Sequence, residues 1–186
     1  MAGGAGAVGN AAIQLARWAG AVVITTVSSE EKGALARSAG AHHVVNYGQG
    51  DPTRQIREIR EIVPDGIDIA VEVAPARNIL IDLDLVKTHG LISIYANNGG
   101  DQLTMPIRAA FGRNLRLQFI ILYTLHPHLI RRAIEDVTLA VVAGALQVGE
   151  RAGLPLHHFS LQQAAAAHDA VEGGAVGKVL IDVAEA

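Results

Sequence analysis

A glycine-rich segment near the amino terminus constrains the fold of this 186-residue chain more than any other feature. Residues 4–9 read Gly-Ala-Gly-Ala-Val-Gly, which fits the pattern G-x-G-x-x-G, and a segment with helical hydrophobic spacing follows at residues 10–19. In such a loop one glycine permits a tight turn, another lets the backbone approach a pyrophosphate, and the last lets a helix and a strand pack closely. The N–H groups at the start of the helix attract an anion. We therefore predict a dinucleotide phosphate loop, with a flexible leader or an ordinary tight turn as the alternatives. Its candidate binding residues are Gly4, Gly6, Ala7, Val8 and Gly9.

Short β-branched runs alternate with longer amphipathic segments along the rest of the chain. This alternation is typical of repeated βα units, in which helices cover a parallel sheet. Helix ends are also marked: Ser28 and Glu31 form a capping-box pattern, Asp51 precedes a proline, and Gly40 can end a helix. The predicted fold class is α/β with a doubly wound parallel sheet of the Rossmann type, with strands at residues 21–27, 43–47, 67–73, 91–95 and 115–121.

The strand that should precede the glycine loop is missing from the sequence, because only three residues come before Gly4. In a doubly wound sheet that first strand lies at the centre and is hydrogen-bonded on both sides. We therefore expect a sheet that lacks its first strand, with two unpaired edges beside an apolar groove. An amino-terminal truncation is the interpretation that this pattern favours.

The sequence pattern changes near Arg151. A short strand is predicted at residues 155–159, an alanine-rich helix at 161–171, and a final strand at 178–183 after a glycine-rich turn. We expect a strand-helix-strand appendage here. The chain is accordingly divided into a dinucleotide-binding part, residues 1–150, and a carboxyl-terminal segment, residues 151–186.

The end of the strand at residues 21–27 indicates which dinucleotide is bound. An NAD-selective site carries Asp or Glu about 20 residues beyond the glycines, where it binds the ribose hydroxyls. Here the segment 25–29 reads Thr-Thr-Val-Ser-Ser, without an acid, and Lys32 follows. Hydroxyls and positive charge suit a 2′-phosphate, which a carboxylate would repel. We predict NADP(H) with Ser28 and Lys32 at the phosphate; the alternative is that Ser28 only caps a helix and Lys32 only meets solvent.

Several motifs occur in an order that resembles one protein family. They are Gly3 to Gly9, Gln14-Leu15-Ala16, Ser28 to Lys32, Gly40-Ala41-His42, Asn46-Tyr47, Ala167-His168-Asp169-Ala170 and Gly177 to Leu180. The set resembles the quinone-reductase, or zeta-crystallin-like, branch of the medium-chain dehydrogenase/reductase superfamily, and it spans nearly the whole chain. The resemblance implies an NADPH-dependent oxidoreductase that transfers hydride to a quinone or an α,β-unsaturated carbonyl.

The same resemblance implies further site residues. In that family Lys32 and Tyr47 contact the adenosine 2′-phosphate, while Tyr95, Phe119 and Ile121 are placed near the ribose and nicotinamide. A strand-end tyrosine with its hydroxyl in water is the alternative for Tyr47. Family members carry a further amino-terminal domain that covers the nicotinamide, and the carboxyl-terminal segment returns to it. No catalytic residue is expected from this chain, because hydride transfer to a conjugated acceptor depends mainly on positioning.

Composition and charge limit the kinds of partner that this chain is expected to bind. The formal net charge of −3 and the lack of a Lys/Arg cluster argue against nucleic acid. The longest apolar runs are far shorter than the roughly 20 residues that span a bilayer, so no membrane is expected. The sequence has no cysteine, which is compatible with the cytoplasm. Because the zinc enzymes of the superfamily use a cysteine-containing site, no zinc or other metal is expected.

A second hypothesis remains open at this point. Without a central strand and a covering domain, the chain could be a catalytically inactive module that binds NADP(H) or another protein. Members of the family are often homodimers, and a homodimer is an open alternative here too, although an exposed sheet edge can also pair artificially.

Overall fold

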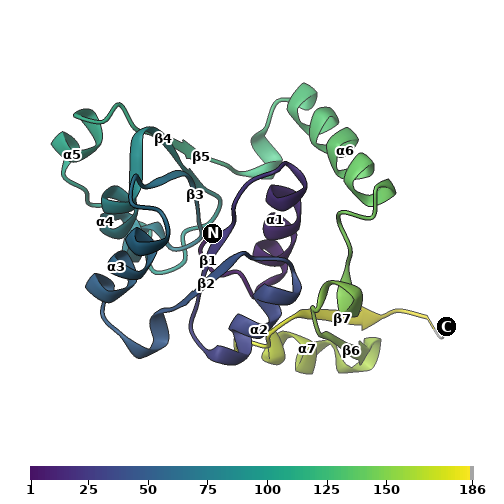
Figure 1. The fold of residues 1–186 in the computed structure, drawn as a ribbon. Coiled ribbons are helices and arrows are strands. Elements are labelled where there is room, and N and C mark those ends of the chain that lie inside the picture. Colours follow the sequence, from purple (N-terminus) through teal and green to yellow (C-terminus); the bar gives the residue numbers. More distant parts are fainter. Residues whose placement is uncertain (185–186) are drawn as a thin grey trace.

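Parallel strands joined by helices form the centre of the molecule (Figure 1). The computed structural model describes residues 1–184. Strand β1 (Ile24–Val27) pairs in parallel with β2 (His43–Asn46). In a second group, β4 (Val86–Ile94) lies between β3 (Ile67–Glu72) and β5 (Arg116–Phe119), again in parallel. Every one of these strands overlaps a predicted strand, and the α/β class is confirmed. Strand β4 begins before residue 91, because Val86 already pairs with Ile67 ahead of an irregularity in the ladder.

The first residues of the chain join the two groups of strands. The backbone N–H of Ala2 donates to the Val71 carbonyl of β3 at 3.0 Å, and the Met1 carbonyl accepts from the Thr26 N–H of β1 at 3.0 Å. Ala2 and Thr26 form an isolated parallel bridge. In space the order is therefore β2, β1, Met1–Ala2, β3, β4, β5, and the amino terminus lies at the centre of the molecule in Figure 1.

Helices cover both faces of these strands. On one face, α1 (Ala7–Trp18) and α2 (Glu30–Ser38) pack against β1 through Ile13, Ala36 and Val27. A separate cluster joins α3 (Pro52–Ile62) and α4 (Pro75–Leu85) to β2 through Ile59, Ile81 and Val45. Val44 packs against the first cluster and Val45 belongs to the second. Because successive strand residues point to opposite faces, the two helix pairs lie on opposite sides of the sheet.

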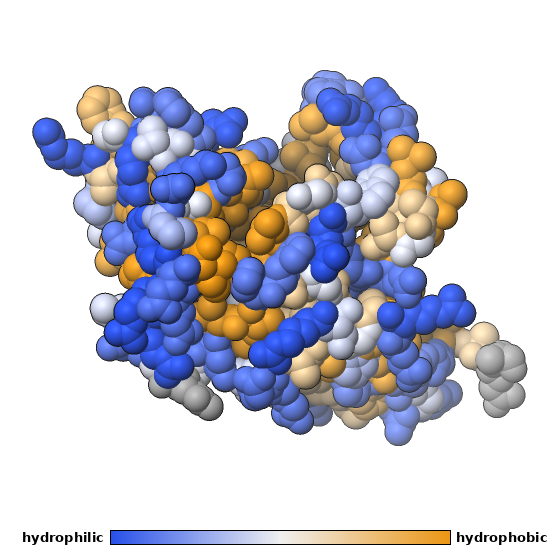
Figure 2. Space-filling model, viewed as in Figure 1, coloured by the Kyte–Doolittle hydropathy of each residue, from blue (hydrophilic) through white to orange (hydrophobic). Residues whose placement is uncertain are grey.

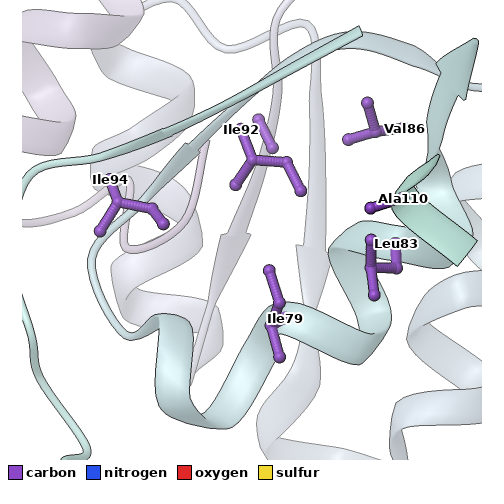
Figure 3. Packing of buried hydrophobic residues seen from close by; sticks show 7 residues of the cluster. Ile79, Leu83, Val86, Ile92, Ile94 and Ala110 are labelled. Carbon is purple, nitrogen blue, oxygen red and sulfur yellow. The ribbon is translucent and has the colours of Figure 1, made fainter. Parts of the chain in front are cut away.

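The largest apolar cluster lies against β4. Figure 3 shows Ile79 and Leu83 of α4, Val86, Ile92 and Ile94 of β4, and Ala110 of the short helix α5 (Ile107–Phe111), all of them buried. This cluster fixes the end of β4 and therefore the position of Tyr95, the next residue along the chain.

The helix ends confirm two predicted signals and correct one. The Asp51 side chain accepts from the Arg54 N–H at 2.8 Å with Pro52 in the first turn, and Gly40 adopts a left-handed φ of 102° just after α2. The prediction that Ser28 caps α2 is wrong. Ser29 is the cap, and its hydroxyl accepts from the Lys32 N–H at 3.2 Å.

The carboxyl-terminal part forms a smaller parallel pair. After the turn η2 (Leu122–Thr124) comes α6 (Pro127–Val142), a long helix that the sequence analysis did not predict. The chain then passes through η3 (Gly149–Ala152). The predicted strand-helix-strand unit follows, as β6 (Leu156–Ser160), η4 (Leu161–Gln163) with α7 (Ala164–Glu172), and β7 (Lys178–Asp182). No helix within residues 1–184 is long and apolar enough to cross a bilayer.

Two buried amides on α1 hold the carboxyl-terminal part in place. Asn10 Nδ2 donates to the Ala152 carbonyl at 2.9 Å. Gln14 Nε2 donates to Asn10 Oδ1 at 2.7 Å and to the Gln147 carbonyl at 3.1 Å, while Gln14 Oε1 accepts from the Gln147 N–H at 2.9 Å. The segment before β6 is thus fixed directly behind the glycine loop.

The Gln14→Ala variant tests the strength of this attachment. It removes three hydrogen bonds and leaves the buried Asn10 Oδ1 without its partner, so we expect the free energy of unfolding to fall by about 2 kcal/mol. Urea unfolding followed by circular dichroism measures the change. The exposed Gln162→Ala variant should stay within about 0.5 kcal/mol of the native protein. Equal midpoints for both variants would contradict the assigned role.

Candidate functional site

The glycine loop forms a tight turn that leads directly into α1. Gly6 N–H donates to the Gly3 carbonyl at 3.2 Å, and Gly3 has a left-handed φ of 70°. Helix α1 begins at Ala7, earlier than the predicted residue 10, so half of the motif belongs to its first turn. In the described part of the chain, no side chain caps this helix start and its first turn contains no acidic residue. The N–H groups of the first turn are therefore available to an anion.

The three glycines of the motif have different surroundings. A Cβ on Gly4 would overlap the Thr25 side chain of β1, and a Cβ on Gly9 would overlap the Gly3 carbonyl oxygen. A Cβ on Gly6 would be 3.7 Å from its nearest atom, the Gly3 carbonyl oxygen. Gly4 and Gly9 are therefore needed for packing of the loop, whereas the space beside Gly6 is open to a ligand.

A lysine and a serine meet at the carboxyl end of β1. Lys32 Nζ donates to Ser28 Oγ at 3.0 Å. Because Ser29 caps α2, the Ser28 hydroxyl is not used as a helix cap. The nearby Glu30 forms an ion pair with Arg37 at 2.8 Å. The alternative in which Ser28 serves only as a cap is wrong, and the end of β1 presents a hydroxyl and an ammonium group together.

Tyr47 follows the neighbouring strand β2 and begins the turn η1 (Tyr47–Gln49). Asn46 Oδ1 accepts from the Gly48 N–H at 2.9 Å and shapes this turn. The turn lies against β1, because a Cβ on Gly48 would overlap the Ser28 carbonyl oxygen. Ser28, Lys32 and the exposed Tyr47 are therefore on the same corner of the sheet, as predicted, while their role in binding stays a prediction.

A second group of predicted residues lines a cavity of about 780 Å³ at the ends of β4 and β5. Tyr95, Phe119 and Ile121 all belong to its lining, and Pro75 at the start of α4 closes one side. Phe119 and Ile121 are 67% and 60% exposed, so their apolar surfaces face this open space. Tyr95 is half-buried, and this burial, together with the negative charge of Glu72, raises the pKa of its hydroxyl.

Glu72 is a buried residue that the sequence analysis missed. Its Oε1 accepts from the Val73 N–H at 2.8 Å, the Ala74 N–H at 2.5 Å and the Asn78 Nδ2 at 3.1 Å. The carboxylate therefore shapes the loop between β3 and α4, which borders the cavity of Tyr95. An acid at the end of the apolar segment 67–73 was the available signal, because a carboxylate in a buried strand requires several donors.

Residues 1–184 contain no group of three or more His, Cys, Asp or Glu side chains that could hold a metal ion. His126 and His128 approach each other with their Nδ1 atoms 2.6 Å apart, and His158 Nδ1 lies 3.0 Å from Asp182 Oδ1. Each of these is only a pair of ligand-type side chains. The described residues do not fit a zinc site.

The chain belongs to the zinc-binding dehydrogenase family, whose model matches residues 7–138. Within that family it belongs to the quinone oxidoreductase branch of the medium-chain dehydrogenase/reductase superfamily, so the predicted resemblance is confirmed. The name of the family refers to zinc, yet the sequence has no cysteine and the described residues lack a metal-binding cluster.

Two curated relatives and two solved structures illustrate the similarity. A 2-haloacrylate reductase of a Burkholderia species is 31% identical over 91% of this chain and 50% of its own length. A structure of 2-haloacrylate reductase has a TM-score of 0.84 at 27% identity and covers 99% of this chain and 56% of that one. A quinone oxidoreductase of Sus scrofa is 26% identical over 96% of this chain and 52% of its own. A quinone oxidoreductase of Escherichia coli, solved with NADPH, has the same fold, with a TM-score of 0.80 at 23% identity over 98% of this chain and 56% of that chain.

The chain spans about half the length of the curated relatives that it matches. Within this half lie the glycine loop, the Ser28–Lys32 corner and the Tyr95 cavity.

Proposed function

We propose that the carboxyl-terminal edge of the parallel sheet binds NADP(H). The pyrophosphate would meet the first turn of α1 beside Gly6, and the 2′-phosphate would meet Ser28, Lys32 and Tyr47. The nicotinamide end would lie in the cavity lined by Tyr95, Phe119 and Ile121. Ligands of open α/β sheets bind at this edge, outside the carboxyl ends of the strands.

The pairing of Lys32 Nζ with Ser28 Oγ is the observation that carries this proposal. A hydroxyl and an ammonium group at the end of β1 offer hydrogen bonds and positive charge to a phosphate. No acid occupies residues 25–29, where a carboxylate would bind the ribose hydroxyls of NAD instead. The NADPH named for the Escherichia coli relative supports the same choice of cofactor.

The proposed chemistry is hydride transfer to a quinone or to an α,β-unsaturated carbonyl compound. Reduced nicotinamide supplies the hydride when it is bound, and the described residues bind and orient it. The exposed Phe119 and Ile121 would provide an apolar wall beside the nicotinamide. The names of the relatives, quinone oxidoreductase and 2-haloacrylate reductase, support an electrophilic conjugated acceptor. No proton donor is assigned to this chain.

The organisation of the whole protein is part of the same proposal. Residues 1–150 would bind the cofactor, and residues 151–186 would lead to a further domain that covers the nicotinamide. The exposed apolar surface of Phe119, Ile121 and Tyr123 supports such a covering part, because large apolar patches mark interaction surfaces. The proposal also includes that the whole protein forms a homodimer and is located in the cytoplasm.

Titration with NADPH, followed by turnover assays, tests this function. We expect quenching of protein fluorescence on NADPH binding, and NADPH oxidation when a quinone or an enone is added. Binding without turnover by this chain would support the alternative of a cofactor-binding module. Failure to bind NADPH would contradict both the reductase and the cofactor-binding module.

A further inference from the structure

The loop that follows β4 is polar and open to solvent. Its residues 96–102 read Ala-Asn-Asn-Gly-Gly-Asp-Gln, and all but the first are exposed. Figure 2 shows apolar surface at the centre of the molecule, and this loop differs from it in composition. Asn97, Gly100 and Asp101 of the loop line the Tyr95 cavity. A chemical change in the loop would therefore reach the cavity.

Asn98 and Gly99 occupy the two central positions of a tight turn in this loop. The Gly100 N–H donates to the Asn97 carbonyl at 3.2 Å, and Gly99 has a left-handed φ of 95°. A positive φ at the third residue is typical of a type II turn, and glycine adopts it without steric cost. The nitrogen that follows the Asn98 carbonyl therefore belongs to a residue without a side chain to shield it.

The two groups that would react with each other in this turn are both free. Within residues 1–184, neither the side-chain amide of Asn98 nor the N–H of Gly99 has a hydrogen-bond partner. Both residues are exposed to water. The Gly99 nitrogen can reach Cγ of Asn98 by closing a five-membered ring, and no bond in the structure has to break before it does so.

The neighbouring Asn97 is held in the opposite way. Its Nδ2 donates to Asp101 Oδ1. The N–H that follows it, which belongs to Asn98, donates to the Val73 carbonyl at 3.0 Å. Both groups needed for ring closure are therefore occupied at Asn97, although the two asparagines are adjacent in the same loop.

The other asparagines of the chain are held as well. Hydrogen bonds fix the side chains of Asn10, Asn46 and Asn78. Asn114 is followed by Leu115, whose N–H donates to the Ala110 carbonyl at 3.1 Å. Within residues 1–184, only Asn98 combines a free side chain with a free N–H on the next residue.

We propose that Asn98 is a site of spontaneous deamidation, whose products alter the part of the Tyr95 cavity that this loop lines. The Gly99 nitrogen attacks Cγ of Asn98. A bond forms between these two atoms, the Cγ–Nδ2 bond breaks, and ammonia leaves with the proton of the Gly99 N–H. Water then opens the cyclic imide. Opening at Cγ gives aspartate, and opening at the backbone carbonyl carbon gives isoaspartate, in which the main chain runs through the former side chain.

Both products change the loop. Each carries a negative charge that Asn98 lacks, and Asp101 of the same loop is already acidic. Isoaspartate also lengthens the main chain inside the turn that the Gly100 N–H and the Asn97 carbonyl close. We expect this turn to open and its neighbours Asn97 and Asp101 to shift at the cavity. The modification does not depend on the proposed cofactor, because water is the only co-reactant.

Incubation of the chain at mildly alkaline pH, folded or unfolded in guanidinium, tests the site by peptide mass spectrometry with fragmentation. Asn97 should convert at least tenfold more slowly in the folded chain, because two hydrogen bonds, each worth roughly fivefold in an equilibrium, must break first. Asn98 should convert at the same rate in both states within about threefold, because an exposed turn needs almost no local unfolding. Protection of Asn98 in the folded chain, or cleavage there without isoaspartate, would overturn the proposal.

Two variants and NMR spectra test the effect on the cavity. Asn98→Gln is the matched control, because its longer side chain would need a larger ring and should keep its amide. In the aged native chain the amide signals of Asn97 and Asp101 should shift, while that of Lys32 stays in place. Asn98→Asp adds the charge without lengthening the main chain and should reproduce only part of the shift. Unchanged loop signals in the aged chain, or equal ageing of Asn98→Gln, would contradict the proposal.

Discussion

Replacing Gly9 with alanine is expected to destabilise the protein by roughly 3 kcal/mol and to abolish binding of NADPH. The added methyl group would overlap the Gly3 carbonyl and the Gly4 Cα, both of which are backbone atoms that cannot rotate away. The loop or the first turn of α1 must therefore move, and both carry the proposed pyrophosphate site. Urea unfolding and fluorescence titration with NADPH measure the two effects.

The Gly6→Ala variant is the matched control for this prediction. Its methyl group would be 3.7 Å from the nearest atom, so the unfolding free energy should change by no more than about 1 kcal/mol. NADPH affinity should nevertheless fall about tenfold or more, because the methyl group occupies the space proposed for the pyrophosphate. Native stability in Gly9→Ala, or unchanged NADPH affinity in Gly6→Ala, would contradict the roles assigned to the two glycines.

The second large effect is expected at Glu72. In Glu72→Ala, the N–H groups of Val73 and Ala74 and the amide of Asn78 lose their common acceptor, so we expect a loss of roughly 3 to 5 kcal/mol of stability. The loop from β3 to α4 should rearrange, which would also disturb the neighbouring cavity of Tyr95.

The Glu72→Gln variant separates geometry from charge. It keeps one acceptor oxygen for the same three donors and should lose only about 1 to 2 kcal/mol. Urea unfolding of both variants at pH 7 gives the comparison. Equal losses in the two variants would show that the acceptor geometry of Glu72 does not stabilise the loop.

Much of the fold could be predicted because two kinds of local signal mark the same element boundaries. Runs of apolar, β-branched residues mark the strands, and capping residues mark the helix ends. Asp51 and Gly40 mark helix ends as expected, and the strand positions follow from runs of β-branched residues. The choice of cap at α2 could not be decided in this way. Ser28 and Ser29 are chemically identical, and only the path of the backbone after β1 selects Ser29.

Other features depend on contacts between distant segments. The attachment of Gln14 to Gln147 joins residues that are far apart in sequence, so no local pattern could reveal it. Helix α6 was not predicted, although its apolar residues recur at helical spacing, and within the described residues only its Ala140 is buried. For the site, the motifs predicted two groups of candidate residues, and the structure places the members of each group together, while their role in binding stays a prediction. The donors that surround Glu72 required the three-dimensional structure.

The most direct test of the account compares the dissociation constants of NADPH and NADH for the native chain and for Lys32→Ala. Lys87→Ala is the control, because Lys87 pairs with Asp68 at the opposite end of the strands. We expect Lys32→Ala to weaken NADPH by about 10- to 100-fold, the value of a charge-assisted contact, and NADH by less than about threefold. Lys87→Ala should change neither. Equal losses for the two cofactors in Lys32→Ala would contradict the assignment of the Ser28–Lys32 corner to the 2′-phosphate.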